Sequence, residues 1–114
     1  MSKYQLSDEV LALLKDPQAL IPAIAQDVKT REVLMLAYVN QQALAQMIAT
    51  GKATYWSRSR NEIWEKGATS GHTQKVVSLS LDCDGDALLI TVEQTGAACH
   101  TGDLTCFHEP VQLG

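Results

Sequence analysis

Five residues in the second half of the chain, Asp82-Cys83-Asp84-Gly85-Asp86, separate two apolar runs. Residues 75–81 precede them and residues 87–93 follow, and both runs are rich in valine, leucine or isoleucine. Because Asp and Gly tolerate turn geometry, the pattern predicts a β-hairpin with the acidic stretch as its turn. A plain turn needs only one or two aspartates, however, and three at alternate positions repel one another. The stretch is therefore interpreted as a hairpin turn, a cation site, or both.

The residues that follow favour a cation site. Residues 82–108 hold all three cysteines and two of the three histidines of the chain, without one lysine or arginine. Thiolates suit zinc, whereas carboxylates suit magnesium. If residues 82–86 are extended, the aspartates project to one side and Cys83 to the other, so one segment could serve two metals. The cysteine spacing matches no common zinc finger, and free cysteines are often small buried residues, so burial remains the alternative.

The remaining patterns predict a small α+β domain that is predominantly antiparallel β with short helices. Residues 21–28 and 33–39 suggest a second hairpin, although the latter run also suits a helix. Residues 53–57 suggest a further strand. Two helices are expected, a short one capped by Ser7 and ended by Asp16-Pro17, and one from Asn40 to Gly51. We expect a single domain over residues 1–114.

The tail after Gly96 has little periodicity, so something other than an apolar face must fix it. Metal coordination through Cys99 and Cys106 would do so. Three cysteines cannot all pair within one chain, and with no signal-peptide core or membrane-length apolar run we expect a cytoplasmic protein that binds no membrane. The net charge of −4 argues against a nucleic-acid binder.

The basic residues are concentrated just before the acidic segment. Residues 52–75 hold five of the nine lysines and arginines but only two acidic residues. Arg58, Arg60 and Lys66, with the glycine-containing stretch that includes Ser70, are typical of anion binding. Trp64 is either a core or edge-strand aromatic or a residue that stacks on a base. A basic region beside a metal-type region suits a phosphorylated small molecule, while a solvated polar loop is the alternative.

Three motifs in order resemble one enzyme family. They are Trp64-Glu65-Lys66-Gly67-Ala68-Thr69-Ser70-Gly71, then Asp82-Cys83-Asp84-Gly85-Asp86, then Cys99-His100-Thr101-Gly102 with Cys106-Phe107. Together they resemble phosphoribosyl-AMP cyclohydrolase of histidine biosynthesis, and the similarity extends from about Ile21 to Phe107. The resemblance implies an intertwined homodimer that opens the adenine ring of phosphoribosyl-AMP at the N1–C6 bond, giving the formimino-carboxamide product.

The same resemblance implies which residues carry the chemistry. Zinc would be bound by Cys83, Cys99 and Cys106, with Cys83 from the partner subunit, and magnesium by Asp82, Asp84 and Asp86. Attack of a zinc-bound water on C6 would open the ring, and His100, next to Cys99, is the first candidate for a base. The expected substrate-binding residues are Arg58, Arg60, Lys66, Ser70 and Trp64.

Two other functions have to be weighed. A structural zinc module that holds a dimer together explains the cysteines, but neither the three aspartates nor the basic region. A nucleoside deaminase also activates water on zinc, yet its H-x-E and P-C-x-x-C signature is absent from the sequence.

Overall fold

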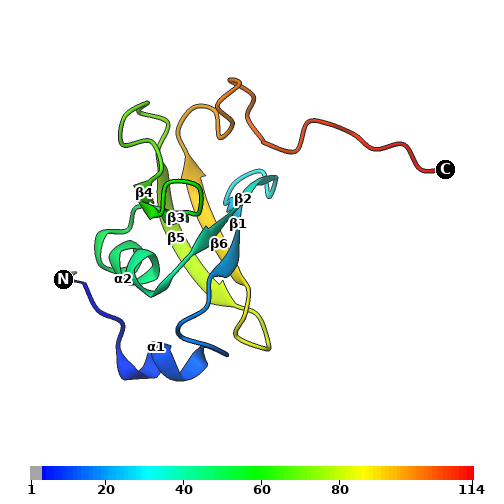
Figure 1. The fold of residues 1–114 in the computed structure, drawn as a ribbon. Helices are drawn as coiled ribbons and strands as arrows, with labels where there is room; N and C mark the ends of the chain where they lie inside the picture. The colour runs from blue at the N-terminus through cyan, green and yellow to red at the C-terminus, as the bar shows by residue number, and fades with distance from the viewer. Residues whose placement is uncertain (1–3) are drawn as a thin grey trace.

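A computed structural model describes residues 4–114 of the chain. Six strands form one mixed sheet in the order β4-β3-β2-β1-β6-β5, with two short helices packed beside it (Figure 1). The elements are α1 (Asp8–Leu13), β1 (Ile21–Asp27), β2 (Val33–Val39), α2 (Gln41–Thr50), β3 (Thr54–Ser57), β4 (Glu62–Glu65), β5 (Gln74–Leu81) and β6 (Leu88–Gln94). The residues after β6 form turns and an extended tail without helix or strand.

Both predicted helices begin at their predicted caps. The Ser7 side chain accepts a hydrogen bond from the Val10 amide at 3.2 Å, and the Asn40 side chain accepts one from Ala43 at 2.8 Å. Such caps satisfy amide groups that the first helical turn leaves free. Gly51 ends α2 in the left-handed conformation, with φ of +73°.

Both predicted hairpins are confirmed, and residues 33–39 form a strand rather than a helix. Strand β1 pairs antiparallel with β2, and β5 pairs antiparallel with β6 around the acidic turn. The sheet is predominantly antiparallel, as expected, because four of its five strand pairs are antiparallel. It is mixed rather than purely antiparallel, because β1 and β6 pair in parallel. Strand β4 was not assigned a range from the sequence, but it lies at the edge of the sheet and contains Trp64, for which an edge-strand position was expected.

One face of the sheet carries the core. Ala23 and Ala25 of β1 are fully buried in a cluster that includes Leu44 and Met47 of α2. On the opposite face, Ile24 pairs in register with Leu36 of β2 and Leu89 of β6, and all three are exposed. The sheet therefore leaves an apolar row crossing three strands without cover from the described part of the chain. Within residues 4–114, no helix has the length and apolar character needed to cross a bilayer.

Candidate functional site

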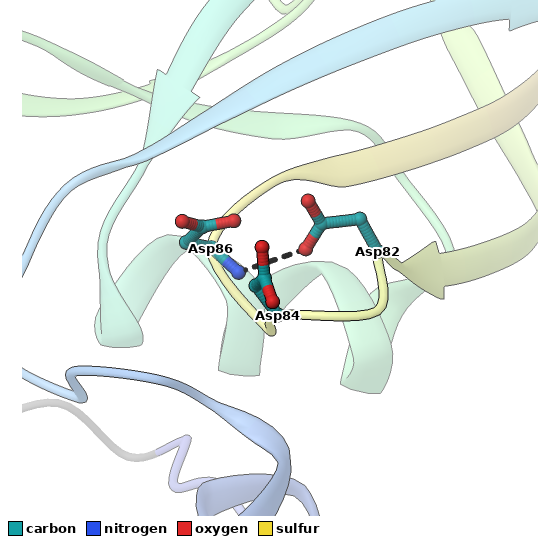
Figure 2. Close-up of side chains that lie close together, drawn as sticks. All are labelled: Asp82, Asp84 and Asp86. Atoms are coloured by element: carbon teal, nitrogen blue, oxygen red, sulfur yellow. Dashed lines mark hydrogen bonds between the residues drawn. The ribbon is translucent and has the colours of Figure 1, made fainter.

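The turn between β5 and β6 gathers three carboxylates (Figure 2). One oxygen from each of Asp82, Asp84 and Asp86 lies within 4.8 Å of the others, and all three residues are exposed. The segment is a turn rather than an extended strand, so the condition on which the aspartates and Cys83 would project to two sides is not met. The turn itself brings the carboxylates together, because Asp82 Oδ1 accepts hydrogen bonds from the amides of Asp86 (3.0 Å) and Ala87 (3.2 Å). These bonds, that from Asp86 foremost, lower the pKa of Asp82.

The segment after α1 packs against this turn. The Lys15 amide donates to the Gly85 carbonyl at 3.0 Å, and the Lys15 ammonium lies 3.7 Å from an Asp86 carboxylate oxygen. Gly85 is buried, has φ of +71°, and a Cβ there would collide with the Leu13 carbonyl. The backbone therefore packs against the turn at a position where only glycine fits.

We expect Gly85→Ala to destabilise the fold by about 2–4 kcal/mol, from the left-handed backbone and the overpacking against Leu13 together. Gly71→Ala is the matched control, because Gly71 has φ of +81° but nothing within 4 Å of an added Cβ. That control should cost only about 1 kcal/mol. Urea denaturation of both variants measures the difference, and equal losses would show that α1 does not press on the turn.

The cysteines of the tail lie at the other end of β6. The Cys99 side chain is buried, accepts a hydrogen bond from the Thr101 hydroxyl at 3.1 Å, and lies 3.6 Å from His108 Nε2. The Thr101 hydroxyl is the main cause that lowers the pKa of Cys99 to about 6. Cys106 interacts with Cys99, and burial raises its pKa. The Cys99 thiol, whose pKa is lowered, therefore lies next to the Cys106 thiol, whose pKa is raised.

A cavity of about 550 Å³ opens beside Cys99. It brings together one predicted zinc ligand, the predicted base and four of the predicted substrate-binding residues, namely Cys99, His100, Arg60, Trp64, Lys66 and Ser70. The β3–β4 hairpin and the following glycine-containing loop form one wall, and the loop after β6 forms the other. These six residues are up to 40 positions apart in the sequence, and the fold places them around one space.

Arg58 lies outside this cavity. Its guanidinium stacks on the Tyr38 ring at 3.9 Å, and it lines a neighbouring hollow with Arg60 and Trp64. Arg60 is exposed and lies 3.5 Å from the Glu62 carboxylate. The two arginines thus mark the outer rim rather than the floor of the site.

The structure does not bring Cys83 to Cys99 and Cys106 within one chain. The acidic turn (yellow in Figure 1) and the loop after β6 (orange) lie at opposite ends of that strand. Seven residues of β6 separate them, which corresponds to about 20 Å of strand. Among residues 4–114, the three aspartates form the one group of three or more potential metal ligands whose atoms all lie within 4.8 Å of one another, and it contains no cysteine.

Sequence reasoning missed the neighbours that tune the tail. The Thr101 hydroxyl, which has one proton to donate, lies within hydrogen-bond distance of both Cys99 Sγ (3.1 Å) and Asp103 Oδ2 (2.7 Å). A buried chain of hydrogen bonds also runs from the Tyr55 hydroxyl to Gln74 (2.6 Å) and on to Gln94 (2.8 Å). A threonine two residues after a cysteine is a weak signal, and nothing local in the sequence points to the Tyr55 chain.

Comparison with known proteins decides the family. A family model described as phosphoribosyl-AMP cyclohydrolase matches residues 35–108. The chain belongs to the phosphoribosyl-AMP cyclohydrolase family. A curated phosphoribosyl-AMP cyclohydrolase from Thermobifida fusca is 62% identical over 107 residues, covering 93% of this chain and 92% of that protein. Those from Nocardioides sp. (58% over 102 residues; 90% and 83%) and Haloarcula marismortui (59% over 96 residues; 84% and 80%) agree.

Membership confirms the resemblance read from the three motifs, and the chain is an enzyme of this family. The acidic turn, all three cysteines and the cavity residues lie inside the matched region 35–108. Helix α1, the segment after it and strand β1 lie before the matched region. The segment after α1 nevertheless contacts the acidic turn, because the Lys15 amide donates to the Gly85 carbonyl. The roles assigned to individual residues from sequence stay predictions.

Proposed function

We propose that this chain is a cytoplasmic hydrolase of histidine biosynthesis that opens the adenine ring of phosphoribosyl-AMP at the N1–C6 bond. The observation that carries the proposal is the cavity that Cys99 and His100 share with Trp64, Lys66 and Ser70. It offers a thiol of lowered pKa, an imidazole, an aromatic ring and cationic groups in one space. These are the groups that a phosphorylated purine and a hydrolytic step require.

The donor set of the tail fits zinc. Cys99 and Cys106 are close enough to interact, and the lowered pKa of Cys99 favours the thiolate that zinc binds. When bound, zinc would supply a nucleophilic water at neutral pH. A third thiolate is required to complete the predicted set, and Cys83 of the same chain is about a strand length away, roughly 20 Å.

A second copy of the chain would supply the missing thiolate. The exposed row of Leu36, Ile24 and Leu89 offers an apolar face of the kind that subunit interfaces cover. A twofold axis would bring the acidic turn of the partner to the tail of the first chain and create two equivalent sites. The proposed assembly is therefore a homodimer in which each site uses residues of both chains.

The residues of the chain itself then have separable tasks. Trp64 presents a ring on which the purine can stack, and Arg60 at the rim, with Arg58 beside it, provides forked donors for a phosphate. Substitution at N1 makes the adenine ring cationic, so C6 is already electrophilic. His100 lines the same cavity, and the role proposed for it is to take a proton from the attacking water and to deliver one to N1 as the ring opens.

His100→Ala should lower kcat by roughly two to four orders of magnitude, the usual contribution of general acid–base catalysis. Zinc content should stay near one per chain, because His100 is assigned no ligand role. Steady-state kinetics and metal analysis of the same preparation measure both quantities. If the loss follows His72→Ala or His108→Ala instead, the base is one of those imidazoles, and if zinc is lost with His100, that residue is a ligand.

The acidic turn fits magnesium, because its three carboxylates are exposed and converge within 4.8 Å. Asp84→Asn should shift the magnesium dependence of turnover to higher concentration while sparing zinc content, since an amide is a poorer ligand for a hard cation. Asp84 accepts no hydrogen bond that holds the described turn, whereas Asp82 does, so Asp84 is the cleaner position for this test. An unchanged magnesium dependence would show that the aspartates form a turn and do not bind magnesium.

The activity is tested by following the absorbance change of purine ring opening with phosphoribosyl-AMP, with and without a chelator. AMP is the control substrate, because it lacks the N1 substituent that activates C6. We expect turnover of phosphoribosyl-AMP alone, lost on chelation. Absence of turnover would favour a structural zinc module, and release of ammonia from AMP would favour a deaminase.

A further inference from the structure

Lys66 reaches from the sheet into the loop that carries Cys99. Its backbone amide donates to the Ala53 carbonyl at 3.0 Å, which anchors the residue beside the start of β3. Its ammonium donates to the Ala98 carbonyl at 2.6 Å, across 32 positions of sequence, and lies 5.5 Å from the Trp64 ring centroid. Two of the directions around the ammonium are thus occupied by the protein itself.

The loop that Lys66 contacts has no regular structure of its own. The Ala98 amide donates to Leu104 at 3.0 Å and the Cys99 amide to Asp103 at 3.1 Å, so the loop is closed on itself. These bonds do not attach it to the sheet. The Thr95 amide, donating to Thr73, and the Cys106 amide, donating to Leu34, tie its two ends, and Lys66 provides a further link between them at Ala98.

The residue that Lys66 grips is the immediate neighbour of Cys99. Ala98 is only 3% exposed, so its carbonyl sits in a place where an unpaired acceptor would be costly. The Lys66 ammonium therefore fixes the loop through a buried acceptor next to Cys99.

We propose that Lys66 is a positioning residue that fixes the Cys99 loop for metal binding, in place of the phosphate-binding role first expected for it. The exposed arginines at the rim remain the candidates for phosphate. The proposal rests on the proposed function only where it makes Cys99 a metal ligand. The link between Lys66 and the loop is a property of the chain alone.

Lys66→Met keeps most of the length of the side chain, one atom short, and removes its charge and donors. Lys66→Arg restores both, and Lys52→Met is the control, since Lys52 is an exposed lysine of the same basic region. The first measurement is a titration of zinc-free protein with Co²⁺, followed by thiolate-to-cobalt absorption. Lys66→Met should weaken Co²⁺ binding by about 10–100-fold, as is usual for partners that orient a ligand, with partial rescue in Lys66→Arg. Kinetics of the zinc-loaded variants should show a lower kcat with an unchanged KM.

The second measurement is amide hydrogen exchange of metal-free protein, which does not depend on the proposed activity. Lys66→Met should speed exchange in residues 97–104, whereas Lys52→Met should not. Unchanged exchange together with unchanged Co²⁺ affinity and a raised KM would overturn the proposal and make Lys66 a phosphate ligand. A different result is that Lys66→Met speeds exchange but even the wild-type protein shows no thiolate-to-cobalt band. This result would support the link between Lys66 and the loop and reject the metal site of the proposed function.

Discussion

Zinc-free protein is expected to lose all measurable turnover while it keeps most of its far-ultraviolet circular dichroism. The reason is the separation of the cysteine loop from the elements that give the signal. The buried cluster joins β1, β2, β6 and α2, and the loop after β6 adds to it only Ala98. Loss of the metal should release that loop without dissolving the sheet.

A strong chelator followed by dialysis prepares the zinc-free protein, and activity and dichroism are measured on one sample. Zinc added back should restore turnover, whereas magnesium alone should not. Retained activity in protein shown by metal analysis to hold no zinc would contradict the mechanism.

Cys83→Ala is expected to abolish turnover as completely as Cys106→Ala, although the two positions lie at opposite ends of β6. Cys83 is exposed and forms no hydrogen bond in the described turn, so its removal should change the free energy of unfolding by no more than about 0.5 kcal/mol. A large loss of activity on replacing a residue that contributes so little to stability would indicate a ligand role. Zinc content should fall in both variants, and full activity of Cys83→Ala would remove this residue from the site.

Local patterns predicted the parts of the fold that local rules govern. The caps at Ser7 and Asn40, the left-handed stop at Gly51 and the two hairpins all follow from residues near one another in sequence. The parallel pairing of β1 with β6 joins residues more than 60 positions apart, such as Ala23 and Leu88, and no local pattern encodes it. Strand β4 was not predicted as a strand because the hairpin that joins it to β3 turns at Asn61, with φ of +54°, inside a stretch dominated by charged residues.

The candidate site was predictable in composition but not in arrangement. The motifs named the residues, and the fold gathers Trp64, Lys66, Cys99 and His100 around one cavity. The bond from Lys66 to the Ala98 carbonyl depends on how two loops meet, so the sequence suggested a phosphate ligand where the structure places an internal contact. The distance between Cys83 and Cys99, in contrast, follows from the length of one predicted strand.

The central claim is that each site takes Cys83 from one subunit and Cys99 with Cys106 from the other. Mixing inactive Cys83→Ala with inactive Cys106→Ala tests it most directly. In a mixed dimer both lesions fall in one site and leave the other whole, and random pairing makes about half the dimers mixed, so roughly a quarter of wild-type activity should return. If each chain built its own site, every site would carry a lesion. If subunit exchange is verified and no activity returns, the shared site is contradicted.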